Sequence, residues 1–266
     1  LLMSLLTGCG PYLPHVGWAI SQMLENAHIQ LVLGYSGYFL LGWVLASARL
    51  SGRAEGLLYI AGLLCLAFSC FAPSFLPVPE EPGQHLKAPV SLKGGDNIST
   101  DDITPASAEF SSMRSNIPLM SQYCYHRYDP AFAARARDMG RSIIVGGENY
   151  GQGSSREHAA INPMYLGVKC VIAKSIARIH KGNLINHGII PMLFEEPADY
   201  DKIELKDELE INGLLDQIPT RHVMVRDNTK GFSFAVRLDL TDNEVEIVLA
   251  GGQLRHLKKQ LQATES

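Results

Sequence analysis

The chain has 266 residues, of which 46% are hydrophobic and 19% are charged, so it is neither a disordered nor a collagen-like protein. Its 23 basic and 27 acidic side chains give a formal net charge of −4, and we therefore expect no nucleic-acid partner. The charges are unevenly divided, because residues 1–78 contain only Glu25, Arg49, Arg53 and Glu55. Two different kinds of polypeptide are joined in this sequence.

Two uncharged apolar runs dominate the N-terminal part. Residues 29–48 and 56–79 both reach the roughly 20 residues that a helix needs to cross a membrane. We expect transmembrane helices over 29–48 and 56–76 in an apolar domain of residues 1–79, which would lie in a membrane; the alternative is a pair of buried helices. Residues 6–9 also match a lipoprotein cleavage box, although no basic stretch precedes them. The stretch GYSGYFLLGWVLA resembles part of the membrane acyltransferase-3 family.

Five prolines between residues 73 and 89 predict an extended linker over residues 80–88, followed by a polar domain over residues 89–260. The five cysteines of the chain contain no C-x-x-C pair and no zinc-ligand spacing with histidine, so we expect no metal site. Their odd number and lack of a repeat are typical of a reducing compartment, and we expect the polar domain to be cytoplasmic. Because the sequence begins with Leu1 rather than Met, we expect a fragment.

Strand and helix signals alternate through the polar domain. Short apolar runs rich in β-branched residues predict buried strands at 142–146, 168–173 and 189–194. Helices are predicted over 155–166 and 175–187, the second one closed by Gly188 at the C′ position. Further strands are predicted at 207–211, 222–227 and 231–239, with a turn at 228–231. Thr241 and Glu244 then form a capping box for a helix that ends at Gly251. The fold class is a mixed α/β domain.

The most informative stretch runs from Gly146 to His158, with the sequence GGENYGQGSSREH. Its glycines let the backbone turn sharply and approach a ligand closely. Ser154 and Glu157 match an S-x-x-E capping box, which predicts a helix beginning at Ser154 whose free N–H groups face an anion. Arg156 in the first turn opposes the helix dipole, and such a broken local rule indicates a functional site.

Two serine hydroxyls beside a guanidinium suit a small carboxylate, because arginine can hold it through two parallel hydrogen bonds. The stretch has neither the Lys-Ser/Thr pair of a phosphate-binding loop nor the glycine spacing of a dinucleotide-binding loop. The alternative is a capped helix that carries a surface arginine. A second polar cluster, GDNISTDDI at 95–103, is followed by Arg114 and is expected to join this site.

The motifs GDNISTDDI, MRSNIP, VGGENYGQGSSREHAA, YLGVKCVIAKSIARIHKGNLIN and VEIVLAGG resemble the swivel domain of the aconitase family, from about residue 88 to residue 258. The resemblance implies the aconitase-type swivelling fold, with mixed β-sheets and flanking helices. It also implies a hydro-lyase, which reversibly removes water from a hydroxy di- or tricarboxylate; we expect citrate and isocitrate, interconverted through cis-aconitate.

The resemblance assigns a role to each residue that matches the family's motifs. Ser154 corresponds to the serine that takes a proton from the carbon next to a carboxylate. Arg114 and Arg156 correspond to arginines that bind substrate carboxylates, and Ser155 to a neighbour that contacts substrate. Asp101 corresponds to an acidic residue that supports the site.

Gly151, Gln152 and Gly153 contribute the backbone of the loop in the same comparison, whereas Asp102 stands where many aconitases have histidine. Family members use a [4Fe-4S] cluster held by cysteines of other domains, so we expect cluster-bearing domains or a large subunit as partner and no activity from this chain alone. The alternatives are the small subunit of an isopropylmalate or homoaconitate isomerase, which Arg114 disfavours, and a non-catalytic, membrane-anchored carboxylate-binding module.

Overall fold

The structure is a computed structural model that describes residues 79–107, 110 and 113–264. The chain divides into two units, Leu1–Ser74 and Phe75–Ser266, and all described residues belong to the second. The transmembrane helices expected at 29–48 and 56–76 lie outside the described residues, as does the acyltransferase-like stretch. Among the residues that are described, no helix is both long and apolar enough to span a membrane.

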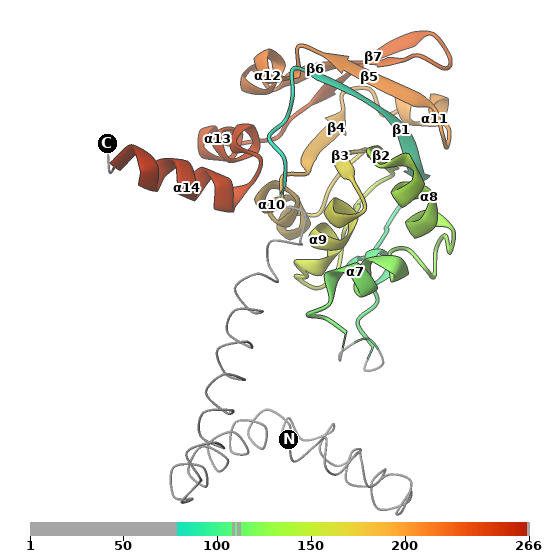
Figure 1. Cartoon of the computed structure of the whole chain (residues 1–266). Coiled ribbons are helices and arrows are strands. Elements are labelled where there is room, and N and C mark those ends of the chain that lie inside the picture. Colours follow the sequence, from blue (N-terminus) through green and yellow to red (C-terminus); the bar gives the residue numbers. More distant parts are fainter. Residues whose placement is uncertain (1–78, 108–109, 111–112, 265–266) are drawn as a thin grey trace, which may run out of the picture. The chain divides into compact units, whose positions relative to one another are not determined.

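Seven strands of the described residues close into a barrel in the order β1-β2-β3-β4-β7-β6-β5 (Figure 1). Strands β1 to β4 pair in parallel, and all remaining pairs are antiparallel. The strands are β1 His85–Lys93, β2 Ser142–Gly146, β3 Val168–Ala173, β4 Ile190–Phe194, β5 Glu208–Asn212, β6 His222–Asp227 and β7 Phe232–Arg237. The mixed α/β class is confirmed, and the expected mixed sheets form one closed barrel.

The helices that follow β1, β2 and β3 pack against the parallel strands of the barrel (Figure 1). The helices of the described residues are α5 Thr100–Ile103, α7 Ile117–Met120, α8 Phe132–Met139, α9 His158–Tyr165, α10 Arg178–Asn186, α11 Asp199–Lys202, α12 Leu214–Gln217, α13 Asp242–Ala250 and α14 Gln253–Thr264, with 3-10 turns η2 Ser121–Tyr123 and η3 Ile218–Thr220. One hydrophobic core fills the barrel, and a second lies between the parallel strands and the helices. Ile143 and Ile144 on β2 contribute to different cores, because successive side chains of a strand point to opposite faces.

The buried strands confirm the sequence-based prediction most closely. β2 and β3 occupy the predicted ranges, and the apolar runs from which they are predicted are buried on both faces of the sheet. β1 differs from the expectation, because it begins at His85 inside the range expected to be linker. It contains Pro89, yet residues 85–89 pair with β5 and Val90 pairs with β2. At the other end of the domain, α14 continues to Thr264, beyond the expected boundary at residue 260.

The predicted helix start at Ser154 is wrong. Helix α9 begins at His158, and Glu157 occupies the N-cap position without a side-chain capping bond. Backbone bonds join Gly151 and Gln152 to residues 98–100, the chain continues as a loop to Glu157, and the capping pattern at Ser154 is not used. A similar box at the start of α13 does form, with Thr241 and Glu244 each bonded to the other's backbone N–H. Helix α10 also begins later than predicted, at Arg178, but ends before Gly188 as predicted.

Candidate functional site

Two loops meet at the carboxyl ends of the neighbouring parallel strands β1 and β2. The N–H of Asn97 donates to the carbonyl of Glu148 at 2.7 Å, that of Gly151 donates to Ile98 at 2.7 Å, and that of Thr100 donates to Gln152 at 2.8 Å. Ligands commonly bind at the carboxyl ends of parallel strands in open α/β sheets, and this closed barrel presents its polar loops at the same edge. The GDNISTDDI and GQGSSREH motifs are therefore brought together, as the sequence predicts.

The glycines of the loop pack tightly against other parts of the chain. A Cβ atom on Gly147 would overlap the carboxylate of Asp96, and one on Gly151 would overlap the imidazole of His180. Gly151 and Gly153 also have φ angles of +78° and +108°, in the region that favours glycine. The space beside Gly147 and Gly151 is thus occupied by the protein itself, which holds the loop in place.

Four of the five side chains predicted for the site, those of Asp101, Arg114, Ser155 and Arg156, either contact each other or line one pocket. The guanidinium of Arg156 forms an ion pair with Asp101, which joins the loop before α9 to α5. Arg114, Ser155 and Arg156 line a pocket of about 290 Å³. Ser154 does not line this pocket; its side chain is exposed, and its carbonyl accepts a hydrogen bond from Thr100 Oγ1 at 3.1 Å.

His158 is a site residue that the sequence analysis missed. Its Nε2 lies 3.0 Å from the carbonyl oxygen of Arg114, and since a carbonyl only accepts, Nε2 carries the proton. The carbonyl of His158 in turn accepts a bond from Thr104 Oγ1 at 3.2 Å. These bonds tie the segment that carries Arg114 to the first turn of α9. The position of His158 two residues after Arg156 could have indicated a site residue. Its hydrogen-bond partner Arg114, however, is 44 residues away, and a sequence pattern does not show such a contact.

The two arginines of the pocket differ in their partners. Arg156 is paired with Asp101 and its side chain is only 22% exposed, whereas Arg114 is exposed and has no ion pair within the described residues. Glu157 lines the same pocket and opposes the two arginines in part. An arrangement with one fixed and one free guanidinium can hold two carboxylates, or one carboxylate from two sides.

A set of buried rings packs against the loop. Tyr150 is buried, and its hydroxyl bonds to the hydroxyl of Tyr125, whose ring packs on Phe132 at 4.5 Å. The ring of His180 lies 5.4 Å from that of Tyr150, and burial lowers the pKa of His180 to about 4. His180 is therefore neutral near pH 7. Its ring fills the space beside Gly151, and its two nitrogens are buried without a hydrogen-bond partner among the described residues.

The described residues do not fit an iron–sulfur cluster. Within them, no group of three His, Cys, Asp or Glu side chains could hold a metal ion. The two cysteines in this part of the chain, Cys124 and Cys170, are buried and free, and burial raises the pKa of both thiols. A buried thiol with a raised pKa is a poor metal ligand, because the thiolate is the form that binds.

Comparisons with known proteins agree with this architecture. The Aconitase C-terminal domain model matches residues 120–197. A probable mitochondrial aconitate hydratase of Dictyostelium discoideum is 43% identical over 122 residues, which are 44% of this chain and 16% of that protein. The mitochondrial aconitate hydratase of Candida albicans is 47% identical over 107 residues, which are 39% of this chain and 14% of that protein. The chain thus spans about a sixth of these relatives.

A solved structure gives the more complete match. The 3-isopropylmalate dehydratase leuD of Methanocaldococcus jannaschii is 32% identical in sequence, with a TM-score of 0.57. The match covers 68% of this chain and 99% of that one. With the fold, the paired loops and the matched domain in agreement, the chain belongs to the family of aconitase C-terminal domains.

Proposed function

We propose that this chain supplies one wall of the active site of a hydro-lyase that interconverts citrate and isocitrate through cis-aconitate. The observation that carries the proposal is the convergence of Arg114, Ser155 and Arg156 on one pocket, with Arg156 held by Asp101. A tricarboxylate needs several cationic partners, and planar guanidinium groups bind carboxylates through paired hydrogen bonds. The aconitate hydratases among the relatives support the choice of substrate.

In this proposal Ser154 is the base that removes a proton from the carbon beside a bound carboxylate. Its exposed hydroxyl has no hydrogen-bond partner among the described residues, while Thr100 holds its backbone carbonyl. The residue is therefore fixed, but its side chain is free to face a substrate. A serine hydroxyl is a weak base and needs help. Arg156 is two residues away, and its charge would stabilise the negative charge that builds on the carboxylate as the proton leaves.

The proposal requires a partner. Since the described residues do not fit an iron–sulfur cluster, cluster-bearing domains or a large subunit would supply that group and the opposite wall of the site. Such a cluster would assist departure of the substrate hydroxyl. The free thiols Cys124 and Cys170 favour a reducing compartment, and the names of the relatives favour the mitochondrion over the cytoplasm that we expect from the sequence.

The test is reconstitution of the chain with cluster-bearing aconitase domains, followed by measurement of cis-aconitate formation from citrate. The Ser154→Ala variant is expected to lose turnover by at least a hundredfold, in line with the usual contribution of a positioned base of about 10²–10⁴. Its affinity for citrate should stay within about tenfold of the original, because binding depends on the arginines. The control is Ser233→Ala, an exposed serine on β7, which should change neither quantity. Near-normal turnover in Ser154→Ala would refute the base assignment.

A second candidate is the small subunit of an isopropylmalate dehydratase, which the match to the leuD structure favours. The two reactions differ in the substrate group that faces Arg114, since isopropylmalate has an apolar branch where citrate has a third carboxylate. Assay of both substrates in complexes with either kind of large partner separates the candidates. Binding of carboxylate without turnover in every complex would instead support a non-catalytic binding module.

A further inference from the structure

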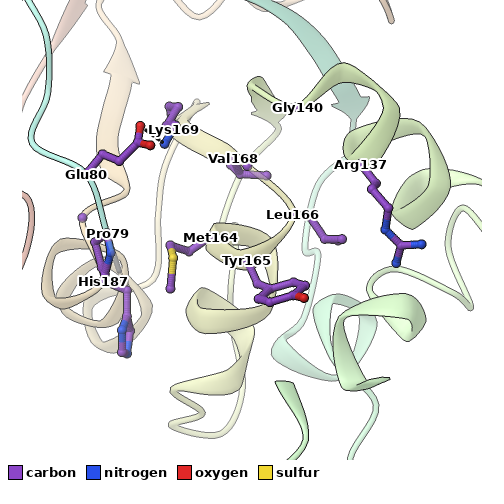
Figure 2. A pocket seen from close by; sticks show the side chains of 12 residues that line it. Pro79, Glu80, Arg137, Gly140, Met164, Tyr165, Leu166, Val168, Lys169 and His187 are labelled. Atoms are coloured by element: carbon purple, nitrogen blue, oxygen red, sulfur yellow. Dashed lines mark hydrogen bonds and ion pairs between the residues drawn. The ribbon is translucent and has the colours of Figure 1, made fainter. Parts of the chain in front are cut away.

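A larger pocket, of about 410 Å³, opens at the opposite edge of the parallel strands from the candidate site (Figure 2). Gly140, Gly167 and Gly188, which come shortly before β2, β3 and β4, lie on its lining, together with Pro79 and Glu80. At about 30 Å³ per water molecule, the volume corresponds to roughly 14 waters. It falls within the range of about 300–1,000 Å³ that is usual for small-molecule sites.

The floor of this pocket is formed by the partly exposed side chains of Met164 and Tyr165, next to the buried Leu166 and Val168. Figure 2 shows the side chains of Met164, Tyr165, Leu166 and Val168 between Arg137 on one side and His187 with Glu80 on the other. A phenol ring beside a thioether gives a surface against which flat or branched apolar groups pack well. Such a floor favours a ligand with an apolar body over a small inorganic ion.

The polar groups around the floor are unequal in their partners. The carboxylate of Glu80 is bound by Lys169 at 3.0 Å and by Arg141 at 3.3 Å, so its charge is already compensated. In contrast, the exposed side chain of Arg137 and the partly buried side chains of Tyr165 and His187 have no hydrogen-bond or ion-pair partner among the described residues. Burial lowers the pKa of His187, so its ring is neutral near pH 7. The unpartnered groups are thus a guanidinium, a hydroxyl and an imidazole, and each of them can donate a hydrogen bond.

The helix ends that border the pocket do not account for Arg137. Basic side chains often compensate the free carbonyls at helix C-termini, and Arg137 lies in the last turn of α8. However, the N–H of Gly140 already donates to the carbonyls of Ala136 and Arg137 at 3.1 Å each. At the end of α10, the N–H of Gly188 likewise donates to Ile185 at 3.1 Å. These three carbonyls are satisfied locally, and a full guanidinium charge exceeds the roughly half charge of a helix end.

We propose that this pocket binds a small organic monoanion with an apolar body, such as an aromatic carboxylate, whose charged group meets Arg137 while its body lies over Met164 and Tyr165. The site is separate from the arginine pocket of the proposed enzyme, because it lies at the other ends of β2 and β3. A ligand there would contact residues 79–80, which border the pocket. Its binding would not compete with binding of substrate at the other end of the strands.

The test uses the full 266-residue chain and benzoate as the probe, with binding measured by calorimetry. Benzoate is expected to bind saturably in the millimolar range; acetate lacks the apolar body and benzylamine carries the opposite charge, so both should bind at least tenfold more weakly. Arg137→Met, which keeps the length of the side chain without its charge, should weaken benzoate binding at least tenfold. Arg226→Met, an exposed arginine on β6, should leave it unchanged.

Two results would overturn the proposal. One is equal binding of benzoate to the Arg137→Met and Arg226→Met variants, with both folded as judged by thermal unfolding. The other is loss of benzoate binding in Arg156→Met but not in Arg137→Met, which would place the carboxylate in the enzyme site. Should Arg137→Met fail to fold, Tyr165→Phe supplies the test, with a several-fold weaker affinity expected and an unchanged affinity contradicting the site.

Discussion

Contacts between residues that lie far apart in the sequence determine the chemistry of the candidate site. Asp101 fixes the guanidinium of Arg156 across 55 residues, and His158 holds the carbonyl of Arg114 across 44. The result is one ion-paired arginine and one exposed arginine without an ion pair among the described residues, both on the same pocket. This asymmetry suits a substrate that must be oriented at one carboxylate and admitted at another.

The constrained arginine should not tolerate a change to lysine. Lysine keeps the charge of Arg156 but lacks the planar fork that can meet Asp101 and a substrate carboxylate together. In the reconstituted complex, Arg156→Lys is expected to weaken citrate binding at least tenfold, measured as a dissociation constant. Arg226→Lys on the outer face of β6 is the matched control. Equal affinity in the two variants would mean that Arg156 is only a surface residue.

Gly151 should be equally intolerant, for a reason of packing. Its φ of +78° strains any residue with a Cβ atom, and that atom would overlap His180. We expect Gly151→Ala to lower the free energy of unfolding by more than about 1 kcal/mol. Gly182 provides the control, because it lies inside α10 with open space around its Cβ position; Gly182→Ala should raise stability by about 0.4–1 kcal/mol. Urea unfolding of both variants checks this, and a stable Gly151→Ala would contradict the loop geometry.

At the scale of elements, two capping boxes with the same sequence pattern behave differently. Thr241 and Glu244 cap α13 reciprocally, whereas Ser154 and Glu157 cap nothing. Ser99 caps the short helix α5 in the same reciprocal way through Asp102. The pattern therefore reports a real local preference. Long-range backbone bonds do not by themselves prevent its use, because the N–H of Thr100 donates to Gln152 beside the capped start of α5.

The cap of α13 can be tested by removing one hydroxyl. Thr241→Ala leaves the N–H of Glu244 without its 3.3 Å bond to Thr241 Oγ1, and we expect a loss of about 1 kcal/mol in the free energy of unfolding. Thr241→Ser retains the oxygen and should stay within a few tenths of a kcal/mol. Chemical denaturation of the two variants measures the difference. Equal stability would show that the cap contributes nothing to α13.

At the scale of the whole molecule, burial of His180 couples stability to pH. Its pKa of about 4 in the folded state lies below the usual 6.5, so the unfolded chain binds the proton more tightly. The free energy of unfolding therefore keeps its full value above pH 6.5 and falls as the pH drops from 6.5 towards 4, because the unfolded chain takes up a proton there. At about 1.4 kcal/mol per pKa unit, this loss of stability amounts to about 3 kcal/mol. Asp227 acts in the opposite sense, because burial raises the pKa of its carboxyl.

The comparison of the original chain with His180→Phe isolates this effect. Phenylalanine keeps a ring against Tyr150 but cannot take up a proton. We expect the difference in unfolding free energy between the two proteins to change by about 3 kcal/mol between pH 7 and pH 4, in favour of the variant at low pH. Thermal unfolding at several pH values measures it. Parallel curves for the two proteins would mean that His180 is not buried in the neutral form.

The sequence by itself determined those features that depend on neighbours in the chain. The apolar runs of β2 and β3, the cap of α13 and the glycine after α10 each arise from interactions within a few residues, and each is confirmed. The tertiary structure alone decided the closure of the barrel, the strand β1 through Pro89, and the late start of α9. The physical reason is the same in each case. These features depend on bonds between residues far apart in the sequence, such as Gly151 to Ile98 and the pairing of β1 with β5, which no local pattern contains.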